Sequence, residues 1–396
     1  MPSSIAGMPF EKFDQVRVGM VGLGRRGSSL LSNVLHVDGA VVTGLYDPDP
    51  DQSGPAAAAV ADSGQEPPAV FGSFEDLLAS DQVDLVCIAT PWDQHTPMAV
   101  AALDAGKHTC VEVPAATTVE ECWALVDASE RAGRHCIMLE NCCYDYNELL
   151  VLNMVRAGMF GELLHAEAAY IHDLREHLLV GQAWRRKTHI SRDGNLYPTH
   201  GLGPVAKYLG INRDDYFTTL VSMSSPHRGL EEYRAEHLPA DDESWSETYR
   251  CGDINTSIIQ TAQGRTILLQ HQVVNPRPYD RLNLISGTKG TFRDFPARIY
   301  LEGQDGPEEY TDLEPYRERF EHELWKDHGS QARSLGGHGG ADYVMFAALI
   351  GSMLRGEAPD MDVYDAAAWS VPGPLSEQSV AAGSAPVAFP DFLRRS

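Results

Sequence analysis

Gly22-Leu23-Gly24-Arg25-Arg26-Gly27 follows directly on the apolar run 16–21. An apolar strand, a glycine-rich turn and then a helix form the dinucleotide-binding fingerprint of a parallel α/β sheet. Gly22 allows the tight turn, Gly24 lets the backbone approach a pyrophosphate, and Gly27 lets the helix pack close to the strand. The free N–H groups at the start of the helix can then bind the phosphates.

Asp47 ends the next apolar run, residues 41–46, and lies 20 residues after Gly27. A carboxylate at this spacing accepts hydrogen bonds from the adenosine ribose and repels a 2′-phosphate. The sequence therefore predicts NAD as the cofactor. Arg25 and Arg26 keep NADP open as an alternative, because arginine beside this pocket can hold a phosphate.

Strand and helix patterns alternate over about the first 140 residues, which predicts a doubly wound parallel sheet. The further strands are expected at 83–89, 108–112 and 135–140, with helices at 97–105 and 119–132. Ligands bind at the carboxyl ends of such strands. Those ends carry Asp47, Thr90-Pro91-Trp92, Glu112 and Glu140-Asn141.

Longer strands with alternating polarity follow after about residue 150, and they predict an open, mostly antiparallel sheet with one buried face. They are expected at 163–173, 249–260, 265–274 and 279–287. We therefore expect a Rossmann domain over 1–145 and an α+β substrate domain over 146–396. A helix at 342–355 is a candidate to return to the first domain, and the stretch around 372–374 is expected to be irregular.

The composition limits the kinds of partner that we expect. The formal charge of −25 on 396 residues argues against nucleic acid and anionic membranes. Seven cysteines without a CxxC pair or zinc-ligand spacing predict reduced thiols and no metal. No signal-peptide pattern and no run of 18 apolar residues is visible, so we expect a cytoplasmic protein.

A cofactor domain followed by an open-sheet domain resembles the Gfo/Idh/MocA oxidoreductases, which carry Glu-Lys-Pro after the fifth strand. Here the triplet is Glu112-Val113-Pro114, without the catalytic lysine. The chain is more similar to glycosyl hydrolase family 109 through segments 22–27, 111–116, 139–144 and 194–204. Tyr197-Pro198-Thr199-His200-Gly201 is the most specific of these.

The resemblance implies an NAD-dependent glycosidase, a known exception to the two-carboxylate scheme. It implies cleavage of terminal N-acetylgalactosaminides, with the α anomer favoured, by oxidation at carbon 3, elimination, water addition and re-reduction. It places these residues against NAD: Arg25, Arg26, Asp47, Trp92, Asp93, Gln94, His95, Glu112, Val113 and Asn141. Arg185 is a weaker candidate, for contact with the cofactor or the sugar, and a solvated basic run is the alternative.

The expected catalytic pair is His200 as general base and Tyr197 as its acid/base partner, because histidine titrates near neutrality. A structural histidine and a packing tyrosine are the alternatives. The expected sugar-binding residues are Tyr170, Tyr197, Pro198, Thr199, His200 and Tyr279, although Tyr170 and Tyr279 also suit sheet packing.

Two other functions stay open at this point. An NAD(P)-dependent sugar or inositol dehydrogenase would fit the fingerprint, but the missing lysine argues against it. A non-catalytic NAD-sensing or scaffold protein would leave Tyr197 and His200 unexplained. The expected ligand is a small-molecule glycoside or glycan terminus. A homo-oligomer is also expected, since open sheets in the resembling superfamily form dimers.

Overall fold

The computed structural model describes residues 4–181, 183–304, 306 and 308–394. The chain divides into two units. The first comprises Met1–Leu149, Glu321–Ala368 and Phe392–Ser396, and the second comprises Leu150–Phe320 and Trp369–Asp391. Residues 321–368, which the sequence analysis grouped with the substrate domain, thus belong to the first unit.

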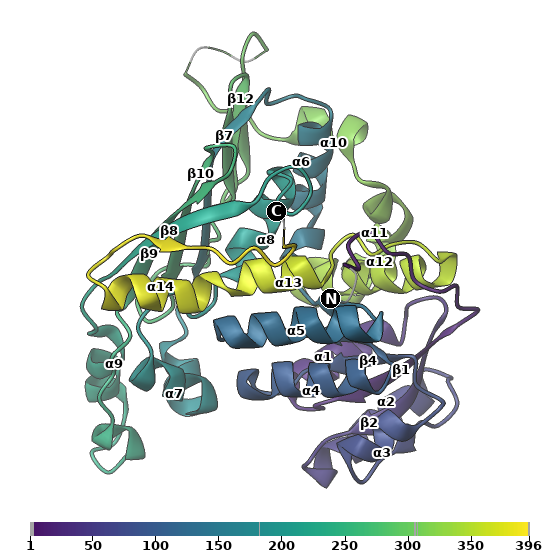
Figure 1. Cartoon of the computed structure of the whole chain (residues 1–396). Coiled ribbons are helices and arrows are strands. Elements are labelled where there is room, and N and C mark those ends of the chain that lie inside the picture. The colour runs from purple at the N-terminus through teal and green to yellow at the C-terminus, as the bar shows by residue number, and fades with distance from the viewer. Residues whose placement is uncertain (1–3, 182, 305, 307, 395–396) are drawn as a thin grey trace. The chain divides into compact units, whose positions relative to one another are not determined.

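A six-stranded, all-parallel sheet forms the centre of the first unit, with strand order β3-β2-β1-β4-β5-β6 (Figure 1). This is the order of a dinucleotide-binding doubly wound fold, as the sequence predicted. Its strands are β1 (Val16–Val21), β2 (Ala40–Tyr46), β3 (Ala69–Val70), β4 (Leu85–Ile88), β5 (His108–Val111) and β6 (Cys136–Met138). The intervening helices are α1 (Arg25–Val34), α2 (Pro50–Asp62), α3 (Phe74–Ala79), α4 (Trp92–Asp104) and α5 (Val119–Ala132).

Local sequence explains why α5 begins and ends where it does. Thr118 and Glu121 form a capping box, and Gly133 ends the helix at φ 60°. β4 and β5 are buried along their whole length, and β4 is accordingly apolar throughout.

The segments after β6 and after residue 320 complete the first unit. They are η1 (Asn141–Tyr144), α6 (Tyr146–Arg156), α11 (Glu323–Leu335), η4 (His338–Gly340), α12 (Ala341–Arg355) and α13 (Val363–Ser370). α6 and α13 each run past a unit boundary. The indole N–H of Trp325 donates to the Tyr144 carbonyl at 2.8 Å, so α11 is tied to η1.

The second unit is built on an eight-stranded sheet of order β13-β12-β11-β7-β10-β9-β8-β14 (Figure 1). The strands are β7 (Leu163–Ile171), β8 (Phe217–Ser224), β9 (Ile254–Thr261), β10 (Thr266–Gln272), β11 (Leu284–Gly287), β12 (Gly290–Arg293), β13 (Arg298–Leu301) and β14 (Val387–Ala388). β7 and β10 pair in parallel and the other neighbours are antiparallel, which confirms the expected mostly antiparallel sheet.

The helical segments of the second unit include η2 (His177–Gly181), α7 (Ala183–Ser191), α8 (Thr199–Tyr208), α9 (Gly229–His237), η3 (Glu243–Ser246), α10 (Glu314–Phe320) and α14 (Pro372–Ala381). The prediction of irregular chain around 372–374 is wrong, because Pro372 begins α14. Proline is favoured at the first helical position, where its missing N–H costs nothing. The Ser379 hydroxyl of this helix accepts from the Ser222 N–H of β8 at 2.9 Å.

Across the part of the chain that the structure describes, no helix combines the length and apolar character needed to cross a membrane.

Candidate functional site

The glycine-rich turn has the geometry that the fingerprint requires. Gly22 adopts φ +83°, and a Cβ there would lie 2.7 Å from the Ala89 carbonyl oxygen. A Cβ at Gly27 would overlap the carbonyl of Gly22, so α1 approaches β1 as closely as only glycine permits. Gly24 is exposed, a Cβ there would meet nothing within 4 Å, and no side chain caps α1. The turn therefore offers the open backbone surface and helix N-terminus that a pyrophosphate needs.

Asp47, at the end of β2, is held against this turn. Its carboxylate accepts from the Leu23 N–H at 2.6 Å and from the Asp49 N–H at 2.9 Å. A carboxylate has about four acceptor positions, so two such bonds leave capacity for ribose hydroxyls. The arrangement fits NAD at the position that the sequence predicted.

Two buried polar atoms lie at the carboxyl ends of two strands of the parallel sheet, on either side of β5. Thr90 Oγ1, after β4, and Asn141 Nδ2, after β6, have no hydrogen-bond partner among the described residues. Buried polar groups are rarely left unsatisfied, so each fits a site that a ligand completes. Asn141 was expected against NAD from the resemblance, and Thr90 was singled out by its position alone.

The Trp92–His95 segment forms the first turn of α4. Trp92 and His95 are buried, whereas Asp93 and Gln94 are exposed. The His95 ring nitrogens lie 2.8 Å from the carbonyl oxygens of Pro114 and Thr90. The ring thus connects the ends of two strands and supports the loop that carries Thr90.

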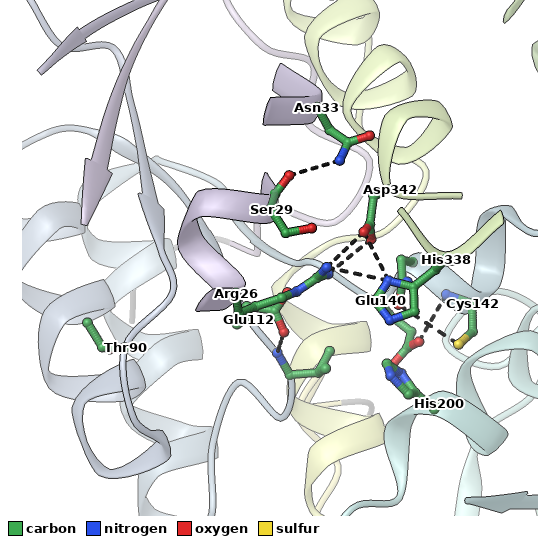
Figure 2. Close-up of polar contacts among 12 residues, drawn as sticks. Arg26, Ser29, Asn33, Thr90, Glu112, Glu140, Cys142, His200, His338 and Asp342 are labelled. Atoms are coloured by element: carbon green, nitrogen blue, oxygen red, sulfur yellow. Dashed lines mark hydrogen bonds and ion pairs between the residues drawn. The ribbon is translucent and has the colours of Figure 1, made fainter. Parts of the chain in front are cut away.

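Arg26 takes part in an ion-pair network of the first unit (Figure 2). Its Nε donates to Glu112 at 2.5 Å, and its Nη1 and Nη2 donate to Asp342 at 2.8 and 3.0 Å. His338 lies 2.9 Å from the same Asp342 carboxylate, which is fully buried. Burial would raise the pKa of Asp342, but the hydrogen bonds of His338 and Arg26 hold it well below its usual range.

This network fixes two residues that the resemblance placed against NAD, Arg26 and Glu112. It also connects His338, in η4, to a buried carboxylate in the first turn of α12. Arg25 is exposed on the first turn of α1. Val113, at the usual lysine position, is a buried apolar side chain and cannot carry a proton.

The second unit brings the expected catalytic and sugar-binding residues together. The Tyr197 hydroxyl lies 3.4 Å from His200 Nε2. The Tyr170 ring lies 4.6 Å from the Tyr197 ring and 5.4 Å from the His200 ring, measured between centroids. All three side chains are less than a tenth exposed, so they form one aromatic cluster at the junction of β7 and α8.

Gly201 explains how α8 reaches β7. A Cβ at Gly201 would overlap backbone atoms of Ala169, so the helix can lie against the strand only without a side chain here. Pro198 is the residue before α8, and the buried Thr199 hydroxyl has no hydrogen-bond partner among the described residues. The whole 197–201 segment thus serves to place one face of α8 on β7.

Arg185 and Tyr279 extend the cluster. The Arg185 guanidinium carbon lies 4.8 Å from the centre of the Tyr197 ring and 5.9 Å from that of Tyr170. This is a cation–π distance, so Arg185 lies beside the sugar-binding candidates, and sugar contact is one of the two roles that the sequence leaves open for it. Tyr279, 39 % exposed, lies edge-on to Tyr170 at 6.5 Å and to His172 at 5.3 Å.

Sequence reasoning missed four residues around this cluster, namely His172, His189, His271 and Arg281. The His271 ring lies 6.4 Å from Tyr170, and burial lowers its pKa, with the nearby His189 adding to the effect. Burial also lowers the pKa of His189 to about 3. Both rings are therefore neutral. His271 lies opposite Tyr170 in the pairing of β7 with β10, and the His189 ring, on α7, lies 6.4 Å from the His271 ring, so no local sequence pattern indicates either position.

Comparisons with known proteins also divide the chain into two parts. Residues 16–140 match the model of the oxidoreductase family with an NAD-binding Rossmann fold, and residues 144–396 match that of the glycosyl hydrolase 109 C-terminal domain. Glycosyl hydrolase family 109 proteins of Solibacter usitatus and Saccharopolyspora erythraea are 55 % and 50 % identical over 99 % of this chain. The matches cover 91 % and 86 % of those proteins.

Solved structures show the same fold at lower identity. A levoglucosan dehydrogenase in complex with NADH and levoglucosan has a TM-score of 0.73 at 19 % identity, covering 95 % of this chain and all of that one. An inositol dehydrogenase homologue from Azotobacter vinelandii, with NADH and myo-inositol, has a TM-score of 0.69 at 18 % identity, covering 96 % and 99 %. The fold is therefore that of NAD-binding oxidoreductases, and by its sequence the chain belongs to glycosyl hydrolase family 109.

Proposed function

We propose that the protein is an NAD-dependent glycoside hydrolase that cleaves terminal N-acetylgalactosaminides, preferably α-linked. The proposed route is transient oxidation at carbon 3, elimination across carbons 1 and 2, addition of water and re-reduction. The observation that carries the proposal is the Tyr197–His200 pair inside a buried aromatic cluster, with an apolar Val113 where a dehydrogenase has its lysine. Family membership supports it independently.

NAD bound at the glycine-rich turn would supply the oxidation of carbon 3 and the later reduction. Gly22, Gly24, Gly27, Asp47 and Asn141 would hold it, on the geometry described above. The protein's own work is then proton transfer and binding. His200 Nε2 would take the proton from carbon 2, which a ketone at carbon 3 makes acidic.

Tyr197 would share this proton through its hydroxyl, 3.4 Å from the ring nitrogen of His200. Catalytic hydrogen bonds are often long without substrate and tighten in the complex, so this distance suits a working pair. Thr199, next to His200, would offer its buried hydroxyl to the sugar, with Pro198 shaping the same turn.

The aromatic residues would bind the sugar itself. The faces of Tyr170 and Tyr279 suit the C–H groups of a pyranose, and their hydroxyls can bond to its polar groups. Arg185 would bind hydroxyl or acetamido oxygens, because a guanidinium only donates hydrogen bonds. Its position over Tyr170 and Tyr197 supports a substrate role.

Aryl glycosides in deuterated water test the proposal. We expect release of the phenol from aryl N-acetyl-α-galactosaminide without net NADH, and deuterium at carbon 2 of the sugar product. The His200→Ala variant should lose both, while His165→Ala, on β7 but outside the cluster, should keep them. Phenol release with only protium at carbon 2 would exclude the elimination route.

The fold neighbours that bind NADH favour a sugar or inositol dehydrogenase as the second candidate. The same assay separates the two. Steady accumulation of NADH from a free sugar or inositol, without cleavage of any aryl glycoside, would support the dehydrogenase.

A further inference from the structure

Tyr279 lies in a segment whose backbone is unusual. Leu282, Asn283 and Phe295 all have positive φ, at 58°, 43° and 58°. The left-handed region is costly for residues other than glycine, and such strain persists only where the surroundings enforce it. The Asp294 N–H donates to the Leu282 carbonyl at 3.3 Å, so the two strained stretches touch each other.

Arg281 occupies the middle of this region. It is only 6 % exposed, and its guanidinium carbon lies 5.2 Å from the centre of the Phe295 ring and 5.8 Å from that of Tyr279. Its Nη1 donates to the Tyr279 hydroxyl at 3.2 Å. The Tyr279 and Phe295 rings meet edge to face at 5.7 Å, so the cation contacts both members of an aromatic pair.

The backbone of Arg281 is fixed to the strand that carries Tyr170. Its carbonyl accepts from the Ala169 N–H at 2.8 Å and from the Asn283 N–H at 2.7 Å. The Arg281 side chain therefore extends from the sheet of the second unit to the exposed Tyr279. An arginine that only filled space could be replaced by another side chain of similar size. Arg281 does more, because its hydrogen bond to the phenol oxygen sets the orientation of Tyr279.

We infer that Arg281 is a positioning residue for Tyr279. It holds the phenol oxygen by a charge-assisted hydrogen bond and, together with Phe295, holds the ring in one orientation. Because arginine only donates, the phenol oxygen is the acceptor in this bond, and the phenol hydrogen points to a different acceptor. Tyr279 thereby presents its ring face and its hydroxyl in one fixed orientation. The role of that orientation in binding a sugar rests on the proposed function.

Fluorine NMR tests the positioning without any assay of activity. The protein is labelled with 3-fluorotyrosine, and the Tyr279 signal among the 15 tyrosines is identified by its loss in Tyr279→Phe. Arg281→Gln should shift and broaden this signal, and Arg281→Lys should do so less. Phe295→Leu, which keeps the cation, should broaden it. The control is Arg277→Gln, since Arg277 bonds to Gln270 and Gln272 and pairs with Asp280 at 3.9 Å.

Kinetics on the aryl glycoside give the second measurement. Arg281→Gln should raise KM about tenfold, because Tyr279 must then be ordered when the substrate binds, with a smaller change in kcat. The double variant Arg281→Gln/Tyr279→Phe should be no worse than Tyr279→Phe alone, because both changes remove the same interaction. The inference would be overturned if the effects of Arg281→Gln and Tyr279→Phe on KM multiplied in the double variant. An unchanged Tyr279 signal in folded Arg281→Gln would also overturn it. If no glycoside is cleaved, the proposed function fails, and the NMR comparison still decides the role of Arg281.

Discussion

Asp47 is a single carboxylate that connects the glycine-rich turn with the choice of cofactor. Its oxygens bond to the Leu23 and Asp49 N–H groups, so the charge is fixed at the turn. Asp47→Asn keeps the shape and removes the repulsion of a 2′-phosphate. We expect the preference for NADH over NADPH to fall about tenfold or more.

Direct titration of both nucleotides measures that preference. Asp51→Asn, in the first turn of α2 and exposed, is the matched control and should leave it unchanged. An unaltered preference in Asp47→Asn would remove Asp47 from cofactor selection.

At the scale of the element, α8 decides where the proposed catalytic pair lies. Gly201 sits at its closest approach to β7, against the backbone of Ala169. Gly201→Ala must push the helix away, and overpacking of this kind costs about 1–3 kcal/mol. We expect a lower free energy of unfolding in urea and a loss of activity.

Gly54 in α2 is the control for this change, because a Cβ there would meet nothing within 4 Å. Gly54→Ala should change the free energy of unfolding by less than about 1 kcal/mol, because helix propensity favours alanine while Pro55 disfavours a helical backbone at the residue before it. Equal effects of the two substitutions would show that Gly201 is not needed for close packing.

The elements also show what sequence reasoning could reach. The helix expected over 119–132 is observed with those bounds, because Thr118, Glu121 and Gly133 are local signals. α14 was missed, since the proline that begins a helix also occurs in irregular chain.

The candidate site divides in the same way. Tyr197 and His200 lie three positions apart, so their meeting on one turn could be predicted from the sequence. The approach of Tyr170, Arg185 and Tyr279 depends on sheet register and helix packing, which no local pattern encodes. The same holds for Asp342, which lies 316 residues from its partner Arg26.

At the scale of the whole molecule, a fall in pH has two opposing effects on the free energy of unfolding. The formal charge of −25 means that protonation of carboxylates relieves self-repulsion as the pH falls. Buried histidines oppose this, since they fold in the neutral form. In the first unit, His108 and His135 stack at 5.6 Å, and Phe10 packs on both rings. Burial, together with a smaller effect of the adjacent His108, lowers the pKa of His135 to about 4.

The sign of the histidine term follows from linkage. In the unfolded chain His135 titrates near its ordinary pKa of 6.5, so between about pH 6.5 and 4 the unfolded state binds the extra proton. Its stabilising contribution is complete above pH 6.5 and is lost as the pH falls through this window. At pH 5 the loss amounts to about 2 kcal/mol.

His135→Gln, measured by urea unfolding at pH 7.5 and pH 5, isolates this term, because the carboxylates contribute equally in both proteins. We expect the wild type to lose about 2 kcal/mol more than the variant between the two pH values. His36→Gln, at an exposed position after α1, should retain the wild-type dependence. If His135→Gln also retained it, proton uptake at the buried ring would not govern the acid response of the first unit.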